Sequence, residues 1–245
     1  MVNIDTVYQR VLALANKEQR GYITPQEFNL FANQAQMDIF EQYFYDLNQF
    51  MRVPGNDTNH ADMVEMLEEK INIFEKETSI SSGIGQDGFG NQIPVFNLAA
   101  NAPNLYRTSQ VRVYRDGGWR VVEKVTKKQL RLMKGGPLTA PSKYRPVYTM
   151  RDKNNLIEFY HDASTIVVDY IRRPKKANWT YVVVGEKALV NPDSAAGYQD
   201  FELHASEETK LVVKILALAG ITLKDPNLYQ IAATEDSKNI QQEKQ

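Results

Sequence analysis

The sequence predicts an α+β protein in which helices from both ends of the chain form one domain and an antiparallel β domain is inserted between them. Apolar residues recur at helical spacing near both termini. In the middle of the chain the period changes to two, which is typical of antiparallel strands with one wet face. We therefore expect residues 1–80 and 204–245 to build the helical domain, and residues 81–203 to build the β domain.

The longest predicted helix runs from just after Thr24 to about Met51. Thr24 and Glu27 are spaced as a capping box, and the proline between them suits the first helical position. Apolar residues lie on two faces of this helix, so two packing partners are expected. The second stripe, which includes Phe40 and Phe44, packs either within the subunit or against another copy. Both residues are therefore candidates for a subunit contact.

Four further helices are expected, and each follows a residue whose side chain can accept a hydrogen bond from a first-turn N–H. In chain order they are a helix through Val7, Val11 and Leu14 capped by Asn3 or Asp5, a helix from Ala61 to about Lys76 capped by Asp57 or Thr58, a helix capped by Ser206 and stopped by Gly220, and a helix from Asp225 to about Lys244.

Strands are expected from about Gln92 onward, because β-branched and aromatic residues alternate with polar ones. The predicted strands are IPVFNL, VRVYRD, WRVVEKV, PVYTMR, LIEFYHD and IVVDYIRR, with YVVVG at 181–185 as one more. A short helix from Lys127 to Lys134, capped by Thr126, interrupts the sheet. The preceding GIGQDGFG segment is interpreted as a linker.

Several chemistries are excluded or unsupported by the residue types present. The chain has no cysteine, which excludes disulfides and thiolate metal sites. Its three histidines, His60, His161 and His204, are dispersed and have no i, i+4 partner. No apolar run approaches the length of a membrane span, and the first residues lack the apolar core of a signal peptide. We therefore expect no enzyme, cofactor, metal or membrane partner.

Two glycine-containing motifs imitate ligand-binding loops without their structural context. Gly83, Gly85 and Gly88 have the G-x-G-x-x-G spacing, but no strand precedes them and no helix follows. An EF-hand-like spacing ends at Glu27, but it places Arg20 where calcium needs an oxygen ligand. Neither nucleotide nor calcium binding is therefore expected.

Charge is divided by position along the chain. Residues 105–176 hold 17 lysines and arginines against 6 acidic residues, a net charge of +11, whereas the remainder has a net charge of −12. Such asymmetry indicates either a polyanionic partner or contact between the middle of one copy and the flanks of another. The candidate interaction residues form two groups: Lys127, Lys128, Arg131 and Lys134 on the short helix, and Arg172, Arg173, Lys175 and Lys176 at a strand end.

The opening VNIDTVYQRVLALANKEQRGYITPQEFNLFANQ and the ending FELHASEETKLVVKILALAGITLKDPNLYQ resemble a family of virion structural proteins of tailed bacteriophages, with members in crAss-like and marine phages. The likeness covers about the first 50 and the last 45 residues. It implies a structural part present in several copies. The helical-plus-β layout is similar to that of head–tail adaptor and tail tubular proteins, which is an analogy of fold alone.

We therefore expect a non-enzymatic virion protein, made in the host cytoplasm, that forms a ring in the neck, the head-to-tail connector or the upper tail. Its expected partners are further copies of the chain and the portal, neck or tail proteins, with non-specific contact to packaged or passing DNA left open. Two alternatives stand beside this one. They are a nucleic-acid-binding module that uses the basic β domain, and a tail-associated carbohydrate-binding adhesin that uses Trp119 or Trp179.

Overall fold

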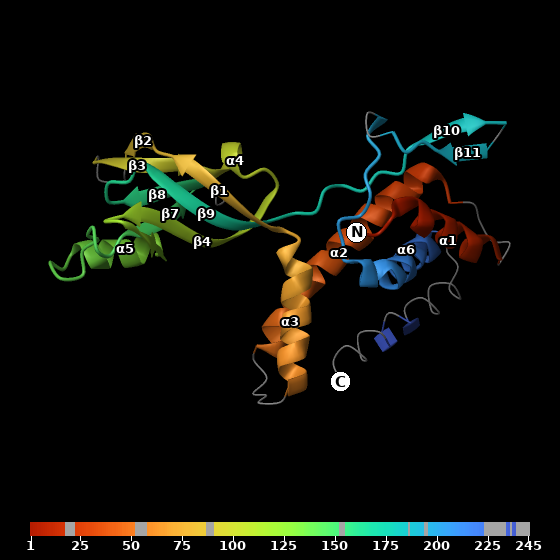
Figure 1. The fold of residues 1–245 in the computed structure, drawn as a ribbon, viewed down its shortest axis with the longest axis horizontal. Helices are drawn as coiled ribbons and strands as arrows, with labels where there is room; N and C mark the ends of the chain where they lie inside the picture. Colours follow the sequence, from red (N-terminus) through yellow and green to blue (C-terminus); the bar gives the residue numbers. More distant parts are fainter. Residues whose placement is uncertain are drawn as a thin grey trace. The chain divides into compact units, whose positions relative to one another are not determined.

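The protein has an α+β fold in which N- and C-terminal helices flank a β-rich middle (Figure 1). The computed structural model describes residues 1–17, 23–51, 58–86, 91–151, 155–185, 187–193, 196–222, 234–235 and 237–238. The chain divides into two compact units. The helical unit comprises Met1–Ile73 and Pro174–Gln245, and the β unit comprises Phe74–Arg173.

These limits differ from the expected boundaries at residues 81 and 203. The first strand, β1 (Glu75–Ser81), pairs along its whole length with β9 (Thr165–Arg172) and so belongs to the β unit. Residues 174–203 belong to the helical unit, because their backbone is bonded to its helices. Both pairings join residues far apart in the sequence, so local periodicity could not reveal them.

The helical unit is built around α2 (Pro25–Phe50), as the capping signal predicts. Thr24 Oγ1 accepts a hydrogen bond from the Glu27 N–H at 3.3 Å, and Glu27 Oε2 accepts one from the Thr24 N–H at 3.0 Å. The Thr24 N–H and the Thr24 hydroxyl, the latter at 2.8 Å, both donate to the Glu27 carboxylate and lower its pKa below the ordinary value. The α2 helix packs against α6 (Glu208–Thr222) and α3 (Thr58–Asn72), and α6 also contacts α1 (Ile4–Lys17).

The caps and ends of the other helices differ in detail from the expectation. Asn3, rather than Asp5, caps α1, since its Oδ1 accepts a hydrogen bond from the Thr6 N–H at 3.0 Å. His204, rather than Ser206, opens the turn before α6, and that helix continues through Gly220. The predicted helix from Asp225 to Lys244 lies almost wholly outside the described residues.

A strap of extended chain, residues 174–179, lies along one face of α2. Gln36 Nε2 donates to the Lys175 carbonyl at 2.8 Å, and Asn33 Nδ2 donates to the Ala177 carbonyl at 2.9 Å. Asn29 binds the next part of the strap, and the Lys175 N–H donates to Glu202 Oε2 at 2.7 Å. The amide side chains at 29, 33 and 36 lie on one helix face and satisfy backbone groups of this segment, which also forms an isolated antiparallel bridge between Asn178 and Gln199.

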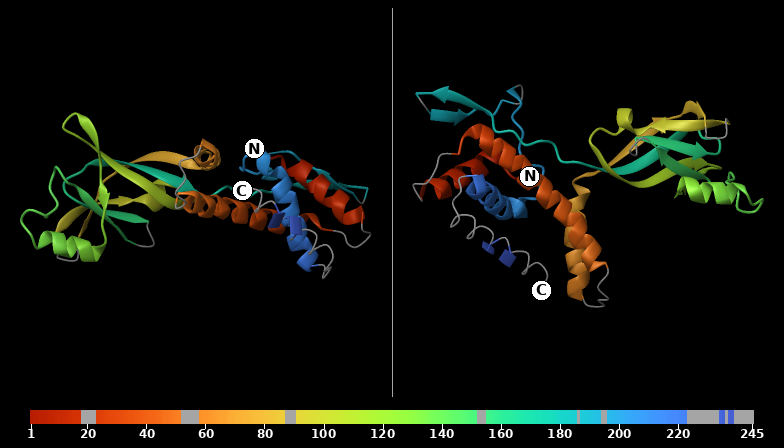
Figure 2. Two further views of the ribbon diagram at one scale, coloured as in Figure 1. Left: turned by 90° about the horizontal axis from the view of Figure 1, so that it is seen from below. Right: turned by 180° about the vertical axis from the view of Figure 1, so that it is seen from behind.

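After the strap, β10 (Tyr181–Val184) and β11 (Lys187–Val190) form a two-stranded antiparallel hairpin. The first of these strands was predicted and the second was not. The hairpin lies at the margin of the helical unit in Figure 1 and in the right view of Figure 2.

The β unit consists of two packed sheets. One has the order β1-β9-β4-β5 and is antiparallel, with β4 at Leu105–Arg115 and β5 at Gly118–Val121. The other has the order β2-β3-β8-β7-β6. Its strands are β2 (Gly83–Gln86), β3 (Gln92–Asn97), β8 (Leu156–Tyr160), β7 (Val147–Arg151) and β6 (Glu123–Lys124), and only the short β6–β7 pair is parallel among these described strands.

The interpretation of GIGQDGFG as a linker is wrong for its first half. Gly83–Gln86 is edge strand β2, which pairs with β3, whereas Gly88 lies outside the described residues. A Cβ added at Gly85 would lie 2.3 Å from Val95 Cγ2 on the neighbouring strand. This glycine therefore permits close approach of two strands, which is a structural reason for its presence.

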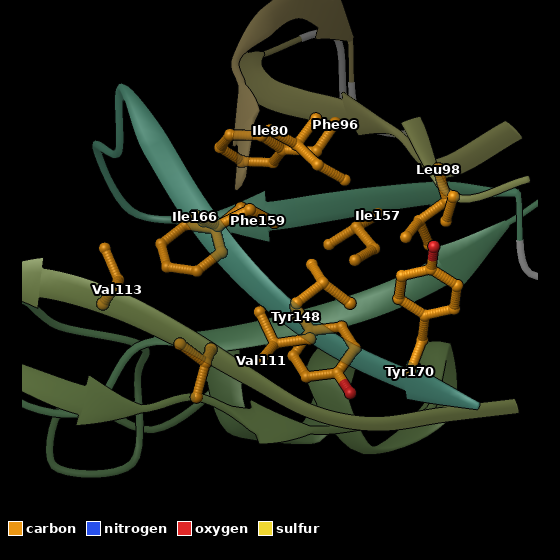
Figure 3. Packing of buried hydrophobic residues seen from close by; sticks show 13 residues of the cluster. Ile80, Phe96, Leu98, Val111, Val113, Tyr148, Ile157, Phe159, Ile166 and Tyr170 are labelled. Carbon is orange, nitrogen blue, oxygen red and sulfur yellow. The ribbon is translucent and has the colours of Figure 1, made fainter. Parts of the chain in front are cut away.

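Apolar side chains from the inner faces of both sheets form the core of the β unit (Figure 3). Phe96 and Phe159 meet edge to face at 6.0 Å, and Ile80, Ile166 and Val168 complete the contact between the sheets. A short helix, α4 (Leu98–Asn101), follows β3 and adds Leu98 to this core. The strands by which the chain enters and leaves this unit, β1 and β9, both contribute side chains to the core.

Candidate interaction surfaces

The first candidate surface is the exposed side of α5 (Lys127–Lys134), which forms as predicted behind a Thr126 capping box. Leu130, 3% exposed, anchors this helix on the outer face of the five-stranded sheet, where it joins a cluster with Val147 and Tyr160. Anchoring by Leu130 turns the basic residues toward solvent. All four predicted residues are exposed: Lys127, Lys128, Arg131 and Lys134.

Not every residue on or near α5 presents a charge to solvent. The Nζ of Lys134 lies 4.8 Å from the Tyr160 ring centroid, so this ammonium is turned to the sheet. Leu132 on α5 and Leu138 beyond the C-terminal end of this helix are 71% and 98% exposed. In the described part of the chain, no salt bridge engages Lys127, Lys128 or Arg131.

The second predicted group, at 172–176, spans the boundary between the units. Arg172 and Arg173 end the β unit, with their guanidinium carbons 6.0 Å from the Phe74 ring and 5.9 Å from the Tyr106 ring. Lys175 and Lys176 begin the strap and have exposed side chains. Within the β unit, α5 and the C-terminal end of β9 lie at opposite ends (Figures 1 and 2). The two basic groups of this unit therefore do not form one patch.

A third surface combines aromatic residues and arginines around the β4–β5 hairpin. Tyr114 and Trp119, 58% and 55% exposed, meet edge to face with their ring centroids 5.3 Å apart. The Arg112 guanidinium lies 5.7 Å from the Trp119 ring. It also forms salt bridges to Asp169 at 2.8 Å and to Glu77 at 3.0 Å. Its charge is thus already balanced within the unit, and the hydrogen bond to Asp169 raises the pKa of Arg112.

The fourth surface was not recognised from the sequence and lies on α3. Leu67 and Ile71 of this helix are buried, which turns the opposite face to solvent. That face carries Asp62, Glu65 and Glu69, all exposed, with Met66 54% exposed among them. Their i, i+3, i+4, i+7 spacing was a readable signal, but only the burial of Leu67 and Ile71 shows that the acidic face is the outer one.

The apolar stripe of α2 does not provide the expected contact at Phe40. Phe40 is 0% exposed and packs edge to face with Phe44 at 5.1 Å. Both α3 and α6 contact α2, and Phe40 is buried within the helical unit. Phe40 is therefore a core residue, whereas Phe44 is half-buried.

Exposed apolar side chains gather instead on the β10–β11 hairpin. Val182, Val183 and Val184 are 49%, 63% and 57% exposed, and Leu189 on the partner strand is 52% exposed. The strands pair only with each other in the described part of the chain. A two-stranded hairpin that exposes its apolar residues is only marginally stable by itself, so a partner surface is expected here.

The tryptophans differ in their availability to a ligand. Trp179 is 1% exposed, lies 4.1 Å from the Tyr8 ring, and donates from Nε1 to Asp5 Oδ1 at 2.9 Å. It is a core residue of the helical unit and offers no sugar-binding face. Of the two tryptophans, only Trp119 is exposed enough to contact a sugar, as the adhesin alternative requires.

Polar groups that could suggest catalysis have structural partners. Buried Glu158 accepts hydrogen bonds from Thr149 Oγ1 at 3.1 Å, the Tyr160 hydroxyl at 3.2 Å and Arg151 Nη1 at 2.8 Å. His161 Nδ1 accepts a hydrogen bond from the Asp162 N–H at 2.8 Å. Across the described ranges, no group of three or more histidines and carboxylates is arranged to hold a metal ion. The EF-hand-like residues around Arg20 lie outside those ranges.

No helix in the described part of the chain has both the length and the apolar composition needed to cross a bilayer. A scan against models of protein families finds no match to the chain, and a search of curated proteins finds no significant relative.

Proposed function

We propose that this chain is a structural protein of a tailed-phage virion that assembles as a ring in the neck, the head-to-tail connector or the upper tail. The resemblance of the first 50 and last 45 residues to phage structural proteins supports this role. Those segments supply α1, α2 and α6, which form the core of the helical unit. The resemblance therefore concerns the part of the chain that organises the fold.

The observation that carries the proposal is the exposed apolar β10–β11 hairpin. Its valines face solvent on a two-stranded element whose outer edges have no described strand partner. Unpaired edges and exposed valines both favour binding to another protein surface. A subunit in a closed ring has such a neighbour on each side, and the two contacts use different surfaces.

The direct test is to detect the protein in purified particles of the phage that encodes it. We expect a constant copy number per particle, and antibody labelling at the junction of head and tail. Particles that lack the protein after infection with a phage that expresses it would contradict the proposal. Substitution of Val183→Lys, in the middle of the hairpin, should reduce incorporation without unfolding the chain, because that side chain is mostly exposed.

Non-specific nucleic-acid binding is the second candidate, and α5 is the observation that favours it. Lys127, Lys128 and Arg131 are exposed and form no salt bridge with described residues. Binding that weakens steeply with salt, with a slope set by the number of phosphates neutralised, would support this function. The arginines around Trp119 add little to it, because Arg112 and Arg120 are paired with carboxylates.

A further inference from the structure

We propose that the acidic outer face of α3 in one copy binds the basic outer face of α5 in the next copy. The acidic face consists of Asp62, Glu65, Met66 and Glu69, and the basic face consists of Lys127, Lys128, Arg131 and Leu132. This inference rests on the proposed function, because it names a further contact between subunits of the ring.

The charges of the two units are complementary. The β unit holds 16 lysines and arginines against 9 acidic residues, a net charge of +7. The helical unit holds 13 against 21, a net charge of −8. A near-neutral chain whose units carry opposite charge attracts copies of itself when the basic unit of one meets the acidic unit of another.

The two faces are also available for contact. Asp62, Glu65 and Glu69 are exposed and, within the described residues, take part in no salt bridge. The same is true of Lys127, Lys128 and Arg131. Other charges of the chain are already used inside their own unit, for example in the Lys70–Glu207 pair at 2.6 Å, where Glu207 is buried. The charged side chains of the two proposed faces therefore form no salt bridges within the described residues and can pair with another copy.

Each face has an apolar residue among its charges. Met66 lies one residue after Glu65 and is 54% exposed, and Leu132 lies one residue after Arg131 and is 71% exposed. On each helix the apolar residue follows a charged residue by four positions, from Asp62 to Met66 and from Lys128 to Leu132. Isolated exposed ion pairs contribute little, so a contact needs buried apolar surface at its centre.

A second copy fits these observations better than DNA does. Lys128 and Arg131 could bind phosphate groups. A phosphate backbone would not bury the exposed apolar side chains of Leu132 and Leu138. A partner that carries both acid and an exposed apolar side chain satisfies the whole face, and α3 has both. Because α3 and α5 are different surfaces of one chain, the contact is head-to-tail and extends to a ring when its rotation closes.

Cysteine cross-linking tests the contact directly, because the chain contains no cysteine. Met66→Cys protein and Leu132→Cys protein are purified separately, mixed and oxidised gently. We expect a disulfide-linked dimer in the mixture and little of it in either protein alone. Leu30→Cys, on α2 and 70% exposed, replaces Met66→Cys as the matched control and should give only background cross-linking with Leu132→Cys.

Charge reversal provides the second measurement. The variants Glu65→Lys with Glu69→Lys, and Lys128→Glu with Arg131→Glu, should each weaken self-association at least tenfold by mass photometry. An equimolar mixture of the two variants should associate again. The reversed, basic α3 of one variant is complementary to the reversed, acidic α5 of the other, and the two unchanged faces are complementary as before. Circular dichroism and thermal melting of each variant establish that the fold is retained.

Failure of this contact is distinguishable from failure of the proposed function. Oligomers that form without the Met66–Leu132 cross-link, or whose formation is unchanged by both charge reversals, would contradict this contact but not the proposed ring. A chain that stays monomeric without cross-linking overturns the contact too, whereas the function fails only if the protein is missing from particles. Reversal on α5 that abolishes salt-sensitive DNA binding but leaves self-association unchanged assigns the face to DNA instead.

Discussion

Asn29 on α2 binds the main chain of Trp179 through both ends of its side-chain amide. Its Oδ1 accepts a hydrogen bond from the Trp179 N–H at 2.8 Å, and its Nδ2 donates to the Trp179 carbonyl at 3.1 Å. The amide thereby satisfies both backbone groups of Trp179, next to the isolated antiparallel bridge between Asn178 and Gln199. Because Trp179 is 1% exposed, neither backbone group has ready access to water as a substitute. The strap is therefore held to the helical unit by a paired interaction that few other side chains can provide.

Replacement of Asn29 by alanine should destabilise the helical unit by about 1–3 kcal/mol, since it leaves buried backbone groups of Trp179 without partners. Asn29→Asp keeps the acceptor but loses the donor, and it should be destabilising as well. Urea unfolding followed by tryptophan fluorescence measures the effect. Gln34→Ala, at an exposed position of the same helix, is the matched control and should change stability by less than about 0.5 kcal/mol. Equal effects of the 29 and 34 substitutions would contradict this account.

Thr24→Ala should cost about 1 kcal/mol, because a first-turn N–H of α2 loses its acceptor. The pKa of Glu27 is lowered in the folded state, so its stabilising effect is present above the ordinary carboxyl pKa and is lost as the pH falls through the folded value. Wild-type stability should therefore decline on acidification more than that of Glu27→Gln, as measured by thermal melting between neutral and acid pH. Identical pH profiles for the two proteins would argue against the capping box.

Gly85→Val should destabilise the β unit by about 1–3 kcal/mol through overpacking against Val95. Adding Val95→Ala to Gly85→Val should restore part of the lost stability, since it removes the methyl group that the added Cβ contacts. Gly83→Ala is the control, because its added Cβ would lie 3.4 Å from the Val95 carbonyl oxygen, an ordinary contact. A double variant no more stable than Gly85→Val alone would show that the strain has another source.

Tyr198 should be among the last tyrosines to ionise. Burial, followed by the charge of Asp200, raises its pKa from 10.0 to about 12, and its hydroxyl donates to Asp200 Oδ1 at 3.1 Å. A raised pKa means that the associated stability is fully present below the ordinary value and is lost as the pH rises through about 12. An ultraviolet difference titration of wild-type protein against Tyr198→Phe isolates this group. A difference signal with a midpoint near 10 would contradict the assigned environment.

Several elements could be predicted because their signals are local. The Thr24 and Thr126 capping boxes each involve residues three apart, and both helices begin where expected. Alternation along β4, β7, β8 and β9 likewise predicted strands, since the side chains of one strand point alternately to its two faces. The missed strand β1 is different. Glu75–Ser81 is mostly polar and exposed, and only its pairing with β9 makes it a strand.

The candidate interaction residues also include some that local sequence patterns could place and some that they could not. Exposure of Lys127, Lys128 and Arg131 follows from their helix and from one anchoring leucine beside them. Phe40 could not be placed by its stripe alone, because periodicity shows that a face is apolar but not whether the covering helix belongs to the same chain. The position of Asn29 against Trp179 was equally invisible to local patterns, since 150 residues separate them.

The amino-acid sequence by itself determined the helical ends, the β-rich middle, the capped starts of α2 and α5, and the separation of basic from acidic charge. The charge separation follows from composition along the chain, and the other features depend on residues within a few positions of one another, where backbone geometry sets which side chains meet. Only the tertiary structure decided that the strap belongs to the helical unit, that Phe40 and Trp179 are buried, and that the acidic face of α3 is exposed. These depend on which distant segments exclude water from one another, and that selection is made by packing of the whole chain.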